Sequence, residues 1–257
     1  MLRQWKDWLW TILTSDLLII IQVRMGSSRL MGKSMLQLGK YKLIEWVLIR
    51  LLDFYHRDNI YIATTDSAQD DILIELVSAF GVNIFRGSEN NVFSRFKKIA
   101  ESNNACQNIV RVCADNPFIS ANLIAEKLKY KQVSKLEYCH SLRLLPNYPF
   151  IDGLGSEVFS SHLFKQIDER KLENFHLEHV TSSFSLIGVD FNTSGLPTPP
   201  EYCFPEISLD IDTRQDYISI TRLISAFDLN PGSSDSEIIS AANTYFKSET
   251  TTKKFIF

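Results

Sequence analysis

Residues 17–23 have the sequence LLIIIQV, a nearly continuous apolar run that is rich in isoleucine. Such a run is typical of a strand that is buried on both faces of a parallel sheet, because neither of its faces meets solvent. A polar loop with glycine follows, and apolar residues then recur at helical spacing over residues 42–54. The pattern therefore predicts that the domain opens with a strand, a loop and a helix.

The same order is repeated along the first half of the chain. Strand patterns occupy residues 60–64, 82–85 and 108–113, and helical patterns occupy residues 70–80 and 91–101. Strands that alternate with helices predict an α/β fold, in which helices cover both faces of a mostly parallel sheet. Ligands of such sheets bind at the carboxyl ends of the strands.

The second half of the chain is less regular. Loops rich in proline or glycine are predicted over residues 146–155 and 193–205, and no internal repeat or clear linker divides the chain. The other predicted elements are a helix over 175–183, strands over 184–189 and 207–211, and helices over 213–227 and 236–246. We therefore expect a single domain over residues 17–257.

The composition narrows the class of function. The chain has 257 residues and a formal net charge of −3, so it lacks the broad basic surface that nucleic-acid binding requires. Its four cysteines form no C-x-x-C pair, and no histidine lies at zinc-ligand spacing, which argues against a zinc cage and a disulfide framework. A reducing cytoplasm is the expected location.

The first 16 residues precede the domain. This segment contains tryptophans at positions 5, 8 and 10, but Lys6 and Asp7 interrupt its apolar run. The uninterrupted apolar stretch is too short for a signal peptide or a transmembrane span. It predicts an amphipathic extension that packs on the domain or a partner subunit, or that associates weakly with a membrane surface.

The loop over residues 24–33 follows the first predicted strand, and it gathers three cations, Arg24, Arg29 and Lys33, with two glycines. Glycine lets backbone N–H groups approach an anion closely, and three cations can hold a triphosphate. The Walker pattern is missed, because five residues instead of four separate Gly26 from Gly32. A solvated surface turn is the alternative interpretation of this loop.

Seven short motifs occur in the order found in one enzyme family. The chain resembles the cytidylyltransferases of the spore-coat polysaccharide biosynthesis type, which are related to the synthetases that make CMP-sugars such as CMP-Kdo. The first motif, roughly Q-A-R-x-x-S-x-R-L-P-G-K, appears as QVRMGSSRLMGK at residues 22–33. The others are ATTDS at 63–67, FRGSENNV at 85–92, RVCADNP at 111–117, DGLGSE at 152–157, EHVT at 178–181 and LDIDT at 209–213.

The resemblance implies a three-layer α/β/α sandwich of the nucleotide-diphospho-sugar transferase type, which is GT-A-like, with a sugar-binding or dimerisation portion around residues 140–205. It implies a homodimeric enzyme that transfers CMP from CTP to a sugar or sugar acid and releases pyrophosphate. Arg24 and Lys33 would be catalytic. The nucleotide would be bound by Gln22, Val23, Arg24, Gly26, Ser27, Arg29, Lys33, Thr65, Asp66 and Arg86.

Two acidic residues are predicted metal ligands. Asp115 lies just past the strand at 108–113, and Asp212 follows the late strand at 207–211. Two carboxylates at the edge of the sheet suit Mg²⁺, which completes its shell with phosphate oxygens and water. Asp210 ranks second, because strand alternation places it on the same side as Asp212. As alternatives, Asp115 shapes a turn before Asn116 and Pro117, and Asp212 belongs to a helix cap with Gln215.

The resemblance places sugar recognition at Asn116, Asp152, Glu157 and Glu178, although structural roles for these residues stay open. His179 is not assigned to catalysis, because a packed or capping histidine is the commoner case at such a position. Residues 155 and 156 depart from the family pattern in the expected sugar pocket, which leaves the acceptor open. Alternative functions are another nucleotidyltransferase or a glycosyltransferase on the same fold, or a non-catalytic nucleotide-sugar-binding subunit.

Overall fold

The computed structural model describes residues 16–254, apart from residues 28, 142–148 and 187–190. The predicted amphipathic extension lies outside the described residues, except for Asp16. Two pieces of the predicted sugar-binding or dimerisation portion also lie outside them, namely residues 142–148 and 187–190.

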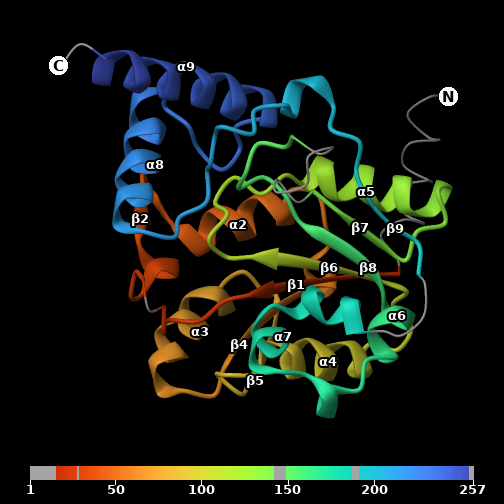
Figure 1. The fold of residues 1–257 in the computed structure, drawn as a ribbon. Coiled ribbons are helices and arrows are strands. Elements are labelled where there is room, and N and C mark those ends of the chain that lie inside the picture. Colours follow the sequence, from red (N-terminus) through yellow and green to blue (C-terminus); the bar gives the residue numbers. More distant parts are fainter. Residues whose placement is uncertain (1–15, 28, 142–148, 187–190, 255–257) are drawn as a thin grey trace, which may run out of the picture.

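A seven-stranded sheet lies at the centre of the molecule (Figure 1). Its strands are β1 (Leu17–Gln22), β4 (Ile60–Thr65), β5 (Asn83–Gly87), β6 (Asn108–Cys113), β7 (Tyr138–His140), β8 (Glu157–Ser160) and β9 (Thr193–Gly195). They are arranged in the order β5-β4-β1-β6-β8-β7-β9. The first four strands in this order run parallel, β8 is antiparallel to both of its neighbours, and β9 is parallel to β7. A separate hairpin pairs β2 (Gln37–Leu38) with β3 (Tyr41–Lys42).

The apolar run that forms β1 supplies both halves of the core. Leu17, Ile19 and Ile21 point into one buried cluster, whereas Leu18 and Ile20 point into the other. All five side chains are at most 1% exposed. Because β1 lies between β4 and β6, neither of its faces nor its edges can meet solvent, which explains why the run carries no polar residue before Gln22.

Helices cover both faces of the sheet, which gives the predicted α/β/α sandwich (Figure 1). The larger core cluster contains side chains of α2 (Leu43–Leu52), α3 (Asp71–Ser78), α5 (Ala121–Val133), α8 (Arg214–Ala226) and α9 (Asp235–Lys254). The smaller cluster contains those of α4 (Val92–Ser102) and α6 (Ser161–Lys165), and Leu177 of α7 (Asn174–Glu178) packs against it. Within the part of the chain that the structure describes, no helix has the length and apolar character to cross a membrane.

Short 3₁₀ helices connect several of these elements. They span Lys33–Met35, Arg57–Asn59, Ala68–Asp70, Glu169–Lys171, Val180–Leu186 and Pro200–Tyr202. The strand predicted from residue 184 is wrong up to Leu186, because this segment belongs to a 3₁₀ helix, and residues 187–189 lie outside the described residues. Phe184 is buried against the rings of Tyr138 and Phe159, so its apolar character reflects packing from a helix rather than a strand.

The late strand predicted over residues 207–211 is also wrong as a sheet strand. Ile207, Leu209 and Ile211 are buried in alternation, as the pattern indicates. However, within the described residues this segment forms only a single bridge, between Asp152 and Ser208. The sequence pattern thus identifies the buried face correctly, but a strand also needs a partner along its whole length.

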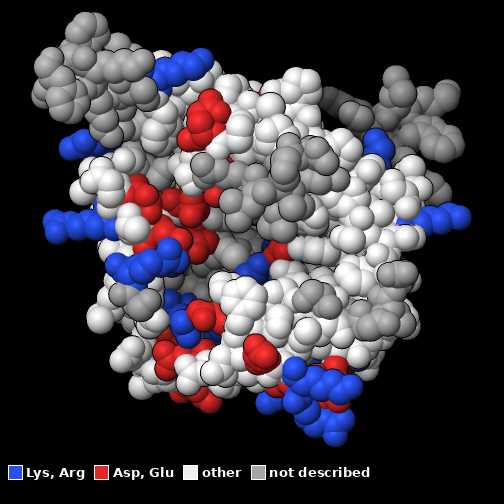
Figure 2. Space-filling model, in the orientation of Figure 1, with Lys and Arg blue, Asp and Glu red and all other residues white. Residues whose placement is uncertain are grey.

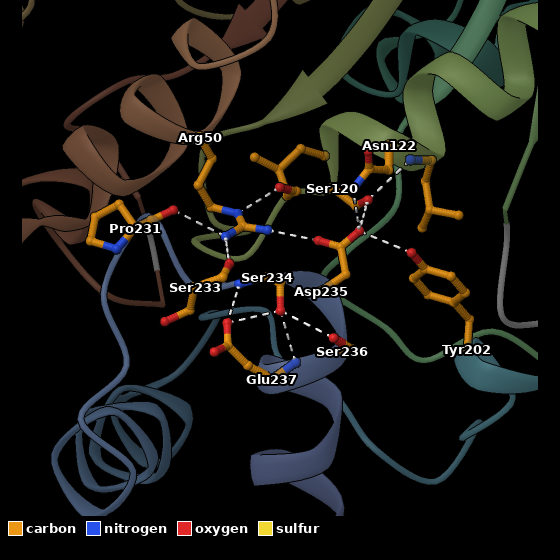
Figure 3. A network of polar contacts seen from close by, with 12 residues as sticks. Arg50, Ser120, Asn122, Tyr202, Pro231, Ser233, Ser234, Asp235, Ser236 and Glu237 are labelled. Carbon is orange, nitrogen blue, oxygen red and sulfur yellow. Dashed lines mark hydrogen bonds and ion pairs between the residues drawn. The ribbon is translucent and has the colours of Figure 1, made fainter. Parts of the chain in front are cut away.

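A buried polar network fixes the start of α9 to the rest of the core (Figure 3). The guanidinium of Arg50, in α2, forms an ion pair of 2.8 Å with Asp235 and also donates to the carbonyl groups of Pro231 and Ser233. The second oxygen of Asp235 accepts hydrogen bonds from Ser120 and Tyr202. These partners of Arg50 and Asp235 are buried or half-buried, so α9 is held by directional bonds as well as by apolar contacts.

Candidate active site

Lys33 lies between the two predicted metal ligands. Its Nζ donates to Oδ2 of Asp115 at 2.9 Å and to Oδ1 of Asp212 at 3.0 Å. The other oxygen of Asp212 pairs with Arg29 at 2.8 Å. Gly32, with φ of +67°, immediately precedes Lys33, and this left-handed conformation turns the loop back toward the sheet. Lys33 and Asp212, which are 179 positions apart in the sequence, therefore meet at one point.

The end of β6 and the start of α8 bring the carboxylates together at the carboxyl edge of the sheet. Asp115 follows β6 by two residues, and its carbonyl accepts a hydrogen bond of 2.9 Å from the N–H of Ile211. Asp212 lies just before α8, whose N-cap is Thr213 in a capping box with Asp216. The alternative interpretation, a cap between Asp212 and Gln215, is therefore wrong, and the carboxylate of Asp212 faces the cations of the loop instead.

A glycine fixes the backbone that carries Asp212. Gly153 has φ of +86°, and a Cβ at this position would lie 2.6 Å from the backbone N of Asp210 and from the carbonyl carbon of Leu209. Burial raises the pKa of Asp210, and so do the neighbouring carboxylates of Asp152, Asp115 and Asp212. The hydrogen bond from Ser208 lowers this pKa, but the other effects outweigh it. Asp152 and Asp210 thus flank the pair at Asp115 and Asp212 without contacting Lys33 directly.

Asp70 holds the start of the loop, and sequence analysis did not identify it. Its carboxylate accepts hydrogen bonds from the backbone N–H of Met25 at 2.8 Å and from Thr64 and Thr65 at 2.5 to 2.9 Å. These bonds outweigh the effect of burial and lower the pKa of Asp70. The loop over residues 24–33 is therefore connected to the end of β4.

A cavity of about 290 Å³ lies over this edge, and Figure 2 shows acidic and basic side chains close together on the face that carries it. The predicted site residues that line it are Gln22, Val23, Arg24, Ser27, Arg29, Lys33, Asp115, Glu178 and Asp212. Other lining residues are Ser34, Val92, Arg95, Arg111, Cys113, Ala114 and His179. The loop after β1, the end of β6, the N-terminus of α4 and the end of α7 thus share one cavity.

Some predicted nucleotide contacts lie outside the cavity lining. The side chain of Thr65 is buried and bonded to Asp70, and Asp66 is exposed. Arg86 donates to the carbonyl groups of Thr65 and Ser67 and pairs with Asp71, so its guanidinium is occupied by protein. Gly26 packs against Glu89, whose carboxylate oxygen would lie 2.7 Å from an added Cβ.

The predicted sugar contacts also divide into a residue that lines the cavity and residues that do not. Glu178 lines the cavity and lies 3.5 Å from the guanidinium of Arg24. Glu157 is only 6% exposed and contacts Arg111, Tyr138 and Thr181, so protein groups surround its carboxylate. Asp152 accepts a bond from the N–H of Gly153. Asn116 forms the turn that continues from β6, and its N–H donates to the carbonyl of Cys113.

Arg111 connects the buried carboxylate of Glu157 to the cavity. Its guanidinium pairs with Glu157 and donates through Nε to Oε1 of Gln22 at 2.9 Å. Arg111 and Gln22 both line the cavity, and they lie on paired strands, where Arg111 is opposite Ile20 and Gln22 is opposite Cys113. Burial opposes the charge of Arg111, but the neighbouring Cys113 and Glu157 raise its pKa, so it stays a cation.

The residues present fit a magnesium ion in part. Asp115 and Asp212 both approach a single cation, the amine of Lys33, within 3.0 Å, so their oxygens converge on a common volume. Carboxylate oxygens are the hard ligands that Mg²⁺ takes, with phosphate oxygens and water filling the other positions. Among the described residues, no group of three or more His, Cys, Asp or Glu is arranged as a metal cage. The site therefore suits an ion that is shared with a phosphorylated ligand.

Comparison with known proteins identifies the family of the chain. The cytidylyltransferase family profile matches residues 18–185. The spore coat polysaccharide biosynthesis protein SpsF of Bacillus subtilis is 35% identical over 234 residues, which cover 89% of this chain and 95% of that protein.

Solved structures share the fold. A cytidylyltransferase from Leptospira borgpetersenii superposes with a TM-score of 0.79 at 26% identity, over 91% of this chain and 95% of that chain. A CMP:2-keto-3-deoxy-manno-octonic acid synthetase complexed with CTP superposes with a TM-score of 0.57 at 16% identity, over 84% of this chain and 100% of that one. The chain thus belongs to the cytidylyltransferase family and is a nucleotidyltransferase.

Proposed function

We propose that this enzyme transfers the cytidylyl group of CTP to an oxygen of a sugar or sugar acid and releases pyrophosphate, as a step in making precursors of a surface polysaccharide. The observation that carries the proposal is the position of Lys33, whose amine lies between the carboxylates of Asp115 and Asp212 in a cavity lined by a basic loop. Cations and hard oxygen ligands together match a triphosphate and its metal ion. The family and the similarity to SpsF support the choice of cytidylyl and of polysaccharide synthesis.

The chemical step needs no covalent enzyme intermediate. The acceptor oxygen forms a bond to the α-phosphorus of CTP, and the bond between that phosphorus and the oxygen bridging to the β-phosphate breaks. The electron pair of the broken bond leaves with pyrophosphate, and the proton of the acceptor hydroxyl passes to water. Lys33 and Arg29 would donate to phosphate oxygens, and this stabilises negative charge that grows on the leaving group.

Asp115 and Asp212 would hold Mg²⁺, which when bound neutralises charge on the triphosphate. Their own part is to present oxygens at the sheet edge, since β6 and the cap of α8 fix both backbones. The acceptor would bind toward Gln22 and Arg111, which line the same cavity. The homodimer and the cytoplasmic location expected from the sequence stay predictions.

Pyrophosphate release tests the proposal. Purified enzyme would be incubated with Mg²⁺, one of the four nucleoside triphosphates, and a panel of sugar acids, sugar phosphates and free sugars. We expect pyrophosphate with CTP and at least one acceptor. Lys33→Met should lower kcat at least about 100-fold, whereas Lys40→Met, at an exposed lysine of the β2–β3 turn, should leave it unchanged.

Each competing function gives a different result in the same assay. Release of a nucleoside diphosphate from a nucleotide sugar would indicate a glycosyltransferase. Pyrophosphate from another nucleotide in preference to CTP would indicate a different nucleotidyltransferase. Nucleotide binding without turnover over the whole acceptor panel would support a non-catalytic binding subunit. Full activity of Lys33→Met would overturn the role given to this lysine.

A further inference from the structure

Arg95 is a buried cation that the proposed chemistry does not yet use. It lies in the first turn of α4, lines the cavity described above and is only 2% exposed. Two nitrogens of its guanidinium, Nε and one terminal nitrogen, are buried and have no hydrogen-bond partner in the described part of the molecule. A buried guanidinium without partners is costly, because the lost hydration is not replaced.

Other buried cations in the described residues are satisfied by protein groups. Arg50 pairs with Asp235, and Arg111 pairs with Glu157. The amine of Lys127 donates to the carbonyl and hydroxyl of Ser156. Arg95 differs because two of its nitrogens lack a partner although the residue lines a cavity, and this difference points to a partner that is not part of the protein.

The electrostatics around Arg95 favour an anion as that partner. Burial and the nearby charge of Arg24 lower the pKa of Arg95 to about 10, against the opposing effect of Asp70, Glu89 and Asp66. The side chain therefore stays charged at neutral pH, next to a second cation. Its position at the N-terminus of an eleven-residue helix adds positive potential.

Charge is already balanced on the other two cations of the loop. Lys33 and Arg29 pair with Asp115 and Asp212 at 2.8 to 3.0 Å. Arg24 has a weaker carboxylate partner, Glu178, at 3.5 Å, and it also donates to the carbonyl of Glu89. The excess positive charge of the cavity thus lies at Arg24 and Arg95.

Space for the guanidinium is provided by the end of β5. A Cβ on Gly87 would lie 3.1 Å from Cγ of Arg95 and 3.0 Å from the ring of Phe85. Glycine at this position lets the Arg95 side chain pass close to the backbone on its way to the cavity. This packing constrains the side chain, so the guanidinium is held in place before any ligand binds.

We propose that Arg95, together with Arg24, binds the phosphate groups of the triphosphate that leave as pyrophosphate. The inference rests on the proposed function and adds a residue that the seven family motifs do not contain. The β- and γ-phosphates carry most of the charge of the nucleotide, whereas the cytosine base is neutral and cannot balance a buried guanidinium. Arg95 would also stabilise the charge that the leaving group gains when the bond to the α-phosphorus breaks.

Calorimetric titration of pyrophosphate, CMP and CTP, in the presence of Mg²⁺, tests this assignment without requiring turnover. The variants are Arg95→Gln and Arg95→Lys, and the control is Lys98→Gln, which removes an exposed charge from the same helix. Arg95→Gln should weaken binding of pyrophosphate and CTP about 10- to 100-fold, and binding of CMP less than about twofold. Arg95→Lys should recover part of the loss, and Lys98→Gln should bind like the wild type.

Other outcomes would overturn the proposal. An equal loss for CMP and CTP would place Arg95 at the nucleoside or the α-phosphate, and unchanged binding would make it a structural charge. Wild-type protein that binds neither CTP nor pyrophosphate would remove the proposed function as well, whereas wild-type binding with an unaffected Arg95→Gln variant would remove only this inference. If Arg95→Gln fails to fold, the ratio of CTP to CMP affinity in Arg95→Lys decides, because an unchanged ratio would contradict phosphate contact.

Discussion

Asp70 accepts a hydrogen bond of 2.8 Å from the backbone N–H of Met25, and this bond joins the loop over residues 24–33 to the end of β4. The same carboxylate is bonded to Thr64 and Thr65, so it occupies the junction of two neighbouring parallel strands. Arg24 directly precedes Met25. The direction in which Arg24 enters the cavity therefore depends on an aspartate that never lines it.

Replacement of this aspartate should weaken nucleotide binding. The side chain of Asn has one acceptor oxygen where Asp70 has two, so in Asp70→Asn one of the present donors loses its acceptor. We expect the Kd for CTP to rise about tenfold and the free energy of unfolding to fall by about 2 kcal/mol. Calorimetry and urea unfolding measure the two effects. Glu75→Gln, at an exposed carboxylate of α3, is the control. An unchanged Kd in a destabilised Asp70→Asn protein would mean that Asp70 only supports the fold.

The paired carboxylates should control the response to magnesium. Asp115→Asn and Asp212→Asn each remove one hard ligand, and we expect kcat to fall at least about 100-fold and the Mg²⁺ concentration for half-maximal rate to rise. Asp210→Asn should cause a smaller loss, because its carboxylate bonds to Ser208 and does not contact Lys33. Steady-state rates over a magnesium titration decide between these roles. A stronger effect at Asp210 than at Asp212 would reverse our ranking.

A methyl group at Gly153 should disturb the acidic edge. The positive φ of Gly153 and the 2.6 Å approach to the backbone of Leu209 and Asp210 leave no room for a Cβ. Gly153→Ala should therefore cost about 1–3 kcal/mol of stability and lower kcat through displacement of Asp212. Gly232→Ala is the matched control, because its added Cβ would meet only the side-chain oxygen of Asn230, at 3.1 Å. An equal loss of stability in Gly153→Ala and Gly232→Ala would disprove the strain argument.

Glu157 should make a pH-dependent contribution to stability. Burial would raise its pKa, but the charge of Arg111 and the hydrogen bonds from Tyr138 and Thr181 lower it below the usual value of 4.5. A carboxylate with a lowered pKa in the folded state stabilises the protein above that usual value, and the contribution is lost as the pH falls through the lower pKa.

Glu157→Gln should thus be less stable than the wild type by about 3 kcal/mol near neutral pH, because it leaves Arg111 buried without a counter-charge. The difference should shrink below about pH 4. Urea unfolding of both proteins over a pH series measures it, and a difference that stays constant down to acid unfolding would contradict the ion pair.

The parts of the molecule that sequence could predict are those in which the signal is local. Residues 17–23 and 108–113 carry their strand pattern within one element, and the cations of the loop lie within ten residues of each other. β7 and β8 have three and four residues, too few for a pattern to emerge. Residues 207–211 show a strand's alternation, but pairing depends on a neighbour that only the fold supplies.

The same distinction, between local signals and contacts that only the fold supplies, holds within the site. Asp115 and Asp212 could be inferred because each ends a predicted element and matches a motif. Asp70 could not, because its partner Met25 is 45 positions away and nothing near Asp70 in sequence points to it. Arg95 belongs to a helix with several polar residues, and only the packing of Gly87 and the cavity beside it distinguish its guanidinium from a solvent-exposed one.

The network around Asp235 sets how far the carboxyl-terminal region can be altered in recombinant versions of the enzyme. Because Asp235 begins α9 and neutralises Arg50, a chain cut before this residue would leave a buried cation next to Ser120, five residues after Asp115. Loss of the last helix would therefore reach the catalytic edge through the turn between β6 and α5. Purification tags belong beyond α9, and a change of helix length should spare its first two turns, where Ile238 and Ala242 are buried.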